Sequence, residues 1–310
     1  MSTTKLKPAF LKKIMAGAEA ITEGSTADYI PELAHVPKDL IALTVQATSG
    51  KAISVANIPE HPATTLQSVS KLIPLIGLLE EFGADRVFSW VNVEPSGSDF
   101  ASIARLAQFG PRPSNPMLNA GAITLCSHIP GEAEDKFRWL DKWVAHLFNK
   151  KLSINSTVLA SEKRTGDNNR AIAYLLQSTG SLNASVKETL DLYLTLCSYE
   201  AKPQDLIHLP FLLANGGVNV DGERILSDDT VKCTLAIMGT CGLYNESGSH
   251  MVKTGMPAKS GVSGYILAVV PGKAGIVVLS PRVTKKGTSV RGEWILEQLS
   301  QQLGWHFALQ

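Results

Sequence analysis

The stretch Gln67-Ser68-Val69-Ser70-Lys71-Leu72 decides how the rest of the chain is interpreted. It opens an apolar segment of helical length, and residues three positions apart share one face of a helix. A helix that begins near Gln67 would therefore place the Ser68 hydroxyl beside the Lys71 amine. A hydroxyl next to a general base is an activated nucleophile, and S-x-x-K is the signature of serine–lysine acyl transfer.

A second motif, Lys259-Ser260-Gly261, opens an apolar strand much later in the chain. S-x-x-K alone is a weak signal, because a chain of this length holds a few such matches by chance. Penicillin-recognising enzymes carry S-x-x-K and a later K-[ST]-G in this order. The two motifs together favour a serine–lysine enzyme over a chance match.

The amino-acid composition limits which classes of protein this chain can belong to. The chain has 310 residues, of which 44% are hydrophobic and 18% charged, and its net charge is +1. These values are ordinary for a globular protein with a hydrophobic core. The charges are mixed along the chain, so no basic stripe favours a nucleic-acid partner. None of the four cysteines forms C-x-x-C, and we expect buried free thiols in a reducing compartment.

The N-terminus predicts a helix rather than a signal peptide. Apolar residues recur there at helical spacing, at Phe10, Leu11, Ile14, Met15 and Ala18. The longest apolar run, Leu72 to Leu79, is too short to span a bilayer. We therefore expect a cytoplasmic protein with no membrane partner.

Strand patterns lie at both ends of the chain. Leu40 to Asn57 alternates around a Thr48-Ser49-Gly50 break and predicts a β-hairpin. Tyr265 to Val270 and Ile276 to Ser280 predict a second hairpin. A final helix is predicted by the stripe Ile295, Leu299, Leu303 and the following Gly304. The segments between the hairpins are mostly helical, including a helix from Asp228 to Met238 that Gly239 and Gly242 would end.

This order of elements predicts an α+β fold. We expect an antiparallel sheet flanked by helices, with an inserted all-helical subdomain. A single domain would span residues 1–310, with the sheet in residues 1–66 and 220–310 and the mostly helical part in residues 67–219. The substrate cleft is expected between the two parts.

Characteristic sequence segments occur along the chain well beyond the two motifs described above. In chain order they are Ala27-Asp28-Tyr29-Ile30-Pro31-Glu32-Leu33-Ala34, the Ser68 stretch, Glu94-Pro95-Ser96-Gly97, Asn115-Pro116-Met117-Leu118-Asn119-Ala120-Gly121-Ala122-Ile123 and Ala258-Lys259-Ser260-Gly261-Val262. Together they resemble the serine-dependent glutaminase family, a cytosolic branch of the β-lactamase/transpeptidase-like fold. The resemblance covers essentially the whole chain.

The resemblance implies hydrolysis of L-glutamine to L-glutamate and ammonia through an acyl-enzyme, without a cofactor or metal. The family's nucleophile falls on Ser68 and its lysine on Lys71. Its substrate-binding positions fall on Tyr29, Ser68, Asn119, Glu162, Asn169, Tyr193, Tyr244 and Val262. Asn168 is an alternative to its neighbour Asn169. The resemblance also implies a homo-oligomer, a tetramer in bacterial members.

The chemistry assigns a role to most of these residues. The backbone N–H groups of Ser68 and Val262 would form an oxyanion hole. Lys71 can act as a base if burial and the nearby charge expected of Lys259 lower its pKa. Tyr244 would hand a proton to the leaving ammonia, and it is the alternative acceptor of the Ser68 proton. The remaining polar residues would hold the α-amino acid, with Glu162 on its ammonium and Asn119, Asn169 and Tyr193 around its carboxylate and amide.

Taken singly, these residues also have ordinary interpretations. Tyr193 lies on an apolar helical stripe and fits a core tyrosine. Asn119 follows a tight proline turn, Glu162 fits a solvated loop acid, and Tyr244 fits a loop aromatic. The histidines show no ligand spacing, and no phosphate-binding glycine motif is present. Only the ordered occurrence of all the motifs favours the site.

Two other functions compete. A β-lactamase or cell-wall peptidase would share the fold, but the missing signal peptide opposes substrates outside the cytoplasm, and nitrocefin turnover would reveal it. A silent glutamine sensor would need no nucleophile–base pair, and release of ammonia from glutamine would exclude it.

Overall fold

The computed structural model describes residues 6–27, 30–96 and 112–309. Its main sheet has the strand order β2-β1-β8-β7-β6, and all neighbouring strands are antiparallel. The strands are β1 (Ala42–Ala47), β2 (Ile53–Ala56), β6 (Ala258–Ser260), β7 (Tyr265–Val270) and β8 (Ala274–Leu279). Both predicted hairpins are confirmed, and β1 pairs with β8 so that the two ends of the chain share one sheet.

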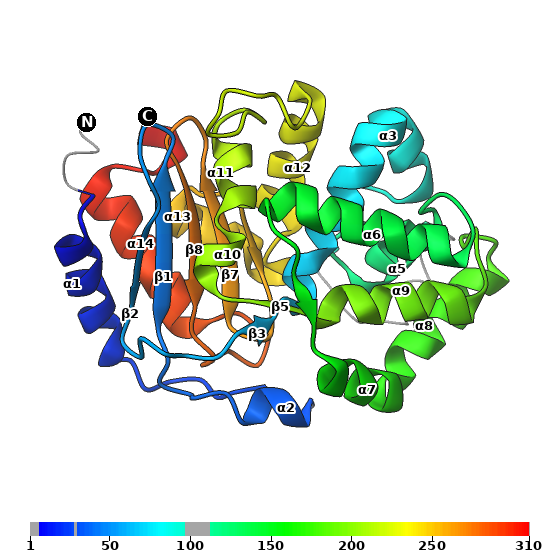
Figure 1. Cartoon of the computed structure of the whole chain (residues 1–310), viewed down its shortest axis with the longest axis horizontal. Coiled ribbons are helices and arrows are strands. Elements are labelled where there is room, and N and C mark those ends of the chain that lie inside the picture. Colours follow the sequence, from blue (N-terminus) through cyan, green and yellow to red (C-terminus); the bar gives the residue numbers. More distant parts are fainter. Residues whose placement is uncertain (1–5, 28–29, 97–111, 310) are drawn as a thin grey trace.

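The central strands are buried on both faces. In β7, Tyr265 and Leu267 belong to one hydrophobic core, while Ile266 and Ala268 belong to another. Successive side chains of a strand point to opposite faces, so one strand serves both cores. The second core packs the sheet against α1 (Pro8–Glu19) and α14 (Val290–Leu303). Both helices were predicted, and Figure 1 shows them beside β1 and β2 at the left.

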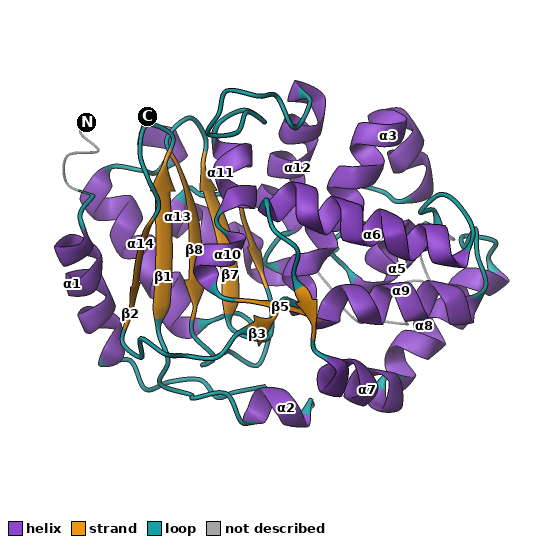
Figure 2. Cartoon of the chain, in the orientation of Figure 1, coloured by secondary structure: helices purple, strands orange, loops and turns teal. Residues whose placement is uncertain are grey.

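The other face of the sheet meets the helical part of the chain, which lies to the right in Figures 1 and 2. Short helices α10 (Pro203–Leu206) and α11 (His208–Ala214) lie against β8. A Cβ on Gly275 would come within 2.4 Å of the Phe211 nitrogen, so this close approach needs glycine. The other helices there are α3 (Leu72–Trp90), α5 (Asn119–Ser127), α6 (Ala133–Phe148), α7 (Ser156–Thr165), α8 (Asp167–Ser178), α9 (Val186–Ser198) and α12 (Asp228–Cys241).

Three features differ from the sequence-based expectation. Gly239 does not end α12, which continues to Cys241 with Gly242 as its C-cap. The S-x-x-K stretch forms a 3₁₀ helix, η2 (Gln67–Lys71), before α3 begins. The helical part also holds a small antiparallel sheet of β3 (Thr64–Thr65), β5 (Tyr199–Ala201) and β4 (Ser153–Ile154). Strands of two or three residues leave no alternation to detect.

Four short or terminal elements complete the described chain: α2 (Pro31–Ala34), η3 (Tyr244–Glu246), α13 (Ser247–Thr254) and η4 (Phe307–Leu309). Of the described helices, none combines the length and the apolar character that crossing a membrane requires.

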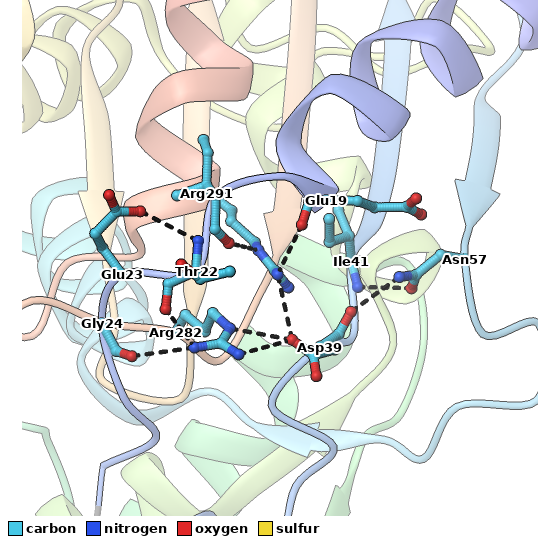
Figure 3. Close-up of polar contacts among 10 residues, drawn as sticks. Glu19, Thr22, Glu23, Gly24, Asp39, Ile41, Asn57, Arg282 and Arg291 are labelled. Atoms are coloured by element: carbon cyan, nitrogen blue, oxygen red, sulfur yellow. Dashed lines mark hydrogen bonds and ion pairs between the residues drawn. The ribbon is translucent and has the colours of Figure 1, made fainter.

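The segment between α1 and β1 is held by two arginines, Arg282 after β8 and Arg291 of α14 (Figure 3). Arg282 donates to Asp39 Oδ1 at 2.9 Å and to the Thr22 carbonyl at 2.6 Å. The buried Arg291 donates to the Ile21 carbonyl at 2.8 Å and also reaches Asp39. Both ends of this segment are therefore tied down, and α2 lies between them.

The middle of the segment between α1 and β1 packs close to the region around the S-x-x-K stretch. Ile30 and Leu33 form a small apolar cluster with Val158 of α7 and with Val262, which follows β6. This cluster brings α2, α7 and the end of the Lys259-Ser260-Gly261 strand together.

Candidate active site

Ser68 lies in a 3₁₀ helix whose first residue has an unusual backbone. In a 3₁₀ helix residues three apart are eclipsed, so Ser68 and Lys71 lie on the same side of η2. Gln67 has a φ of +48°, in the left-handed region that non-glycine residues rarely adopt. Such strain persists only where the surroundings enforce it, and it often marks functional sites. Ser68 itself is half-buried, between the buried side chains of Gln67 and Val69.

Lys71 is completely buried, and no carboxylate of the described residues pairs with it. Its Nζ atom donates to the Met117 carbonyl at 3.0 Å and to Asn119 Oδ1 at 2.7 Å. Both acceptors are neutral, so they do not offset the cost of burying a charge. Burial lowers the pKa of Lys71 to about 7. The predicted lowering of the Lys71 pKa is therefore present, but it comes from burial and not from the charge of Lys259.

Asn119 connects Lys71 to a second asparagine. It is the first residue of α5, and its Nδ2 atom donates to Asn169 Oδ1 of α8 at 2.9 Å. The structure places Asn169, not the exposed Asn168, against Asn119. The result is a continuous chain of hydrogen bonds from the Lys71 amine through two amide side chains.

Lys259 and Tyr244 lie close to Lys71. The buried Lys259 Nζ donates to the carbonyls of Gly242 and Ser260 at 2.9 and 2.7 Å. It sits 4.2 Å from the centre of the Tyr244 ring, and Lys71 Nζ sits 5.4 Å from the same centre. Burial, and secondarily the charge of Lys71, lower the pKa of Lys259. The amines of Lys71 and Lys259 therefore both lie near the Tyr244 ring, in a buried site that disfavours their charged forms.

Two backbone N–H groups near Ser68 have no acceptor among the described residues: those of Ser68 and Val262. The turn that carries Val262 lies close to the start of η2. A Cβ added to Gly261 would come within 2.9 Å of the Leu66 carbonyl oxygen. Glycine at this position permits the approach. Buried N–H groups are nearly always paired, so two unused donors beside a serine favour binding of an oxyanion.

Glu162 of α7 is a buried acid. It forms no ion pair with a described residue. Burial raises its pKa, the negative charge of Glu32 adds to this, and a hydrogen bond from Gln67 opposes it. The buried Tyr193 of α9 lies near both Glu162 and Tyr244, whose charges reinforce the effect of burial in raising the Tyr193 pKa. A buried carboxylate without a cation is suited to a ligand that carries one.

The structure therefore brings together eight of the nine residues that the sequence singled out. They are Ser68, Lys71, Asn119, Glu162, Asn169, Tyr193, Tyr244 and Val262. Tyr29, the ninth, lies outside the described residues. Within the described ranges, no three His, Cys, Asp or Glu side chains are grouped to hold a metal ion.

Sequence reasoning missed two contributors. The Met117 carbonyl, an acceptor for Lys71, is a backbone group that no side-chain pattern reveals. Gln67 adjoins the serine and interacts with Glu162, but only its positive φ distinguishes it.

Comparisons of this chain with known proteins all indicate the same family. The family model described as Glutaminase matches residues 24–307. A curated glutaminase from Legionella pneumophila strain Philadelphia 1 is 65% identical over 310 residues, covering 100% of both chains. One from Alkaliphilus oremlandii is 40% identical over 94% of this chain and 97% of its own.

Solved structures agree with this family. The probable glutaminase ybaS superposes with a TM-score of 0.92 at 35% identity, covering 98% of each chain. A probable glutaminase from Bacillus subtilis, solved in complex with 6-diazo-5-oxo-L-norleucine, has a TM-score of 0.86 at 32% identity over 99% of this chain and 97% of its own. These bacterial glutaminase structures have the β-lactamase-like fold, so the predicted α+β fold of that type is confirmed.

Proposed function

The chain belongs to the glutaminase family and is a glutaminase, and we propose that it cleaves L-glutamine through a glutamyl ester on Ser68 with Lys71 as general base. One observation carries the mechanism: Lys71 Nζ is buried and has two neutral acceptors, Met117 O and Asn119 Oδ1.

The number of acceptors matters because a neutral amine has two N–H bonds and one lone pair, whereas an ammonium has three N–H bonds. The Met117 carbonyl and the Asn119 amide oxygen occupy both N–H bonds of the neutral form. The lone pair then remains for a third direction, and we assign Ser68 to it, because Ser68 precedes Lys71 by three residues in η2 and shares its face of that helix. With its pKa near 7, Lys71 is neutral in a substantial fraction of molecules at physiological pH.

The first chemical step forms the ester. Ser68 Oγ attacks the side-chain amide carbon of glutamine while its proton passes to the Lys71 lone pair. The developing negative charge on the amide oxygen is stabilised by the N–H groups of Ser68 and Val262. Loss of one such donor typically costs about 3 kcal/mol in the transition state.

The leaving nitrogen needs a proton, and the position of Tyr244 supports a role in relaying it. Its ring lies beside both Lys71 and Lys259. We assign to Tyr244 the transfer of a proton to the departing nitrogen, with the Lys71 ammonium as the source. Ammonia leaves, and water then attacks the ester with Lys71 again taking a proton. The Lys71 ammonium returns that proton to Ser68 Oγ as the ester bond breaks, so glutamate is released and both Ser68 and neutral Lys71 are regenerated.

Recognition of the amino-acid end rests on the remaining polar residues. Glu162 pairs with the α-ammonium, because it is a buried carboxylate whose described partners include no cation. Asn119, Asn169 and Tyr193 surround the carboxylate and amide, and Tyr29 is assigned to the same pocket. The Bacillus subtilis relative was solved with 6-diazo-5-oxo-L-norleucine, an α-amino acid, which supports a site of this kind.

Residues 1–310 are proposed to act as one domain, with the sheet part in 1–66 and 220–310 and the mostly helical part in 67–219. The continuous core supports this, since one hydrophobic cluster contains both Leu267 of β7 and Leu125 of α5.

Trapping the ester tests the mechanism. The enzyme would be mixed with L-glutamine, quenched in acid within milliseconds and digested, and the peptide containing Ser68 analysed by mass spectrometry. The proposal expects a glutamyl adduct on Ser68 in the parent and none in Ser68→Ala. Rapid ammonia release from the parent with no adduct at any quench time would favour direct attack by water.

A further inference from the structure

Asn115 is buried in the turn that leads into α5, and each polar atom of its amide is used. Its Oδ1 atom accepts from the backbone N–H of Met117 at 3.0 Å and of Leu118 at 3.2 Å. Its Nδ2 atom donates to the Glu94 carbonyl at 2.9 Å. One side chain therefore fixes the turn from within and ties it to a separate segment.

This turn supplies an acceptor to Lys71, the proposed base. The carbonyl of Met117, whose N–H is held by Asn115, accepts the hydrogen bond from Lys71 Nζ. Two residues later, Asn119 begins α5 and supplies the other acceptor for the same amine. Both acceptors of Lys71 thus lie on a segment whose conformation Asn115 holds.

The turn has little freedom on its other side. A Cβ on Gly121 would come within 2.0 Å of the Asn115 carbonyl oxygen, so the first turn of α5 lies directly on the Asn115 backbone. An asparagine whose oxygen accepts from following N–H groups is a common way to fix a turn. Here its amide nitrogen has a second task, because aspartate or serine would not donate to Glu94 O in the same way.

We infer that Asn115 is a positioning residue for the reaction, which holds the Met117 carbonyl and Asn119 Oδ1 so that the Lys71 lone pair is directed at Ser68. The inference rests on the proposed role of Lys71 as base. Asn115 itself touches neither the reacting atoms nor the amine; it acts through the turn from residue 115 to residue 118.

The electrostatic surroundings of Lys71 define what a charge at position 115 would do. In the described part of the chain, the titratable groups that face Lys71 are Lys259 of β6, Cys126 of α5, Cys197 of α9 and Tyr244 of η3. Both thiols stay protonated because burial raises their pKa, to about 12 for Cys197. No carboxylate among the described residues contributes to the shift of the Lys71 pKa. A carboxylate at position 115 would therefore be a new influence that favours the ammonium form.

Asn115→Asp is the informative variant, because aspartate keeps the two accepted hydrogen bonds, removes the donor to Glu94 and adds a negative charge. The titration of Lys71 would be followed by NMR of lysine labelled at Cε, in a Ser68→Ala background that does not turn over. We expect the midpoint of Lys71 to move up by about one pH unit. In the active enzyme, the acid limb of kcat should move in the same direction.

A matched control exists at Asn219. Its Oδ1 also accepts from two backbone N–H groups, those of Asp221 and Glu223, both at 2.9 Å, but in an exposed turn. Asn219→Asp makes the same chemical change away from Lys71 and should leave both the NMR midpoint and the acid limb in place.

The outcomes separate this inference from the mechanism it rests on. An unchanged Lys71 midpoint in folded Asn115→Asp would show that position 115 does not act on the amine, and would overturn the inference. A shifted midpoint with an unshifted acid limb would contradict Lys71 as the base. Asn115→Ser, which adds no charge and disturbs the hydrogen bonds of the turn, tests the positioning itself: its plateau kcat should fall by about tenfold while Asn219→Ser stays near the parent. Parent-like kcat in folded Asn115→Ser would then overturn the inference.

Discussion

The Nζ atom of Lys71 lies 2.7 Å from Oδ1 of Asn119, and this hydrogen bond joins the proposed base to a proposed substrate-binding residue. An amide oxygen can only accept, and the amide nitrogen of Asn119 donates to Asn169 at 2.9 Å. The orientation of the Asn119 amide is therefore fixed from both ends. A substrate that contacts Asn119 or Asn169 would act on the same chain of hydrogen bonds that holds the base.

Ser68→Ala should abolish ammonia release while glutamine binding remains. Ser68 Oγ makes no hydrogen bond to another described residue that would be lost. Its removal should therefore change the free energy of unfolding by about 1 kcal/mol or less. Ammonia production and calorimetric binding of glutamine measure the two effects. Substantial turnover by the purified variant would remove Ser68 from the role of nucleophile.

Glu162→Gln should weaken glutamine binding more than it slows the saturated enzyme, because Glu162 is proposed to grip the α-ammonium. Loss of a charge-assisted hydrogen bond costs about 1.5–3 kcal/mol, or about ten- to a hundredfold in affinity. Steady-state kinetics should show a raised KM and a smaller change in kcat. N-acetyl-glutamine, which lacks the ammonium, should be a poor substrate for the parent, and equal use of both substrates would contradict the assignment.

Gly121→Ala should destabilise the protein even though alanine favours helices. The added Cβ would lie 2.0 Å from the Asn115 carbonyl oxygen, which belongs to the backbone and cannot move aside cheaply. Overpacking of this kind typically costs about 1–3 kcal/mol. Gly248→Ala in α13 is the matched control, since its Cβ would meet nothing within 4 Å. Thermal unfolding should separate the two, and equal melting temperatures would show that the turn can relax.

The pH dependence of kcat should follow the protonation of Lys71. Burial lowers the pKa of this amine from 10.5 to about 7, so the neutral, proton-accepting form dominates above that pH. Activity should rise with pH through about 7 and, on the acid side, fall about tenfold per pH unit. Initial rates at saturating glutamine provide the profile. A kcat that stays level down to pH 5 would mean that the base has a much lower pKa.

Much of the fold could be predicted because its signals are local. Leu11, Ile14 and Ala18 share one face of α1 and are buried there, as their spacing indicated. Hairpins β1–β2 and β7–β8 follow from alternation and turn residues. Gly304 ends α14 with a φ of +64°, as a glycine stop signal should.

The details of the candidate site depend on contacts that the sequence does not encode locally. Lys71 was predicted to lie beside Ser68, but its two acceptors come from residues 117 and 119, and only tertiary packing brings them to the amine. The interpretation of Glu162 as a solvated loop acid was wrong, because it lies buried in α7. Tyr193 fits both interpretations, the core tyrosine and the site residue, because it is buried and also lies near Glu162.

Comparison of Lys71→Arg with Lys71→Ala tests the central claim most directly, because arginine keeps the positive charge but stays protonated and cannot accept the Ser68 proton. Turnover of glutamine by both variants and the parent should be measured across a range of pH, after circular dichroism confirms that each is folded. If neutral Lys71 is the base, both variants lose nearly all kcat and neither recovers at high pH. If Lys71→Arg keeps most of its activity while Lys71→Ala loses it, the role of Lys71 is electrostatic, and Tyr244 becomes the better candidate for taking the proton.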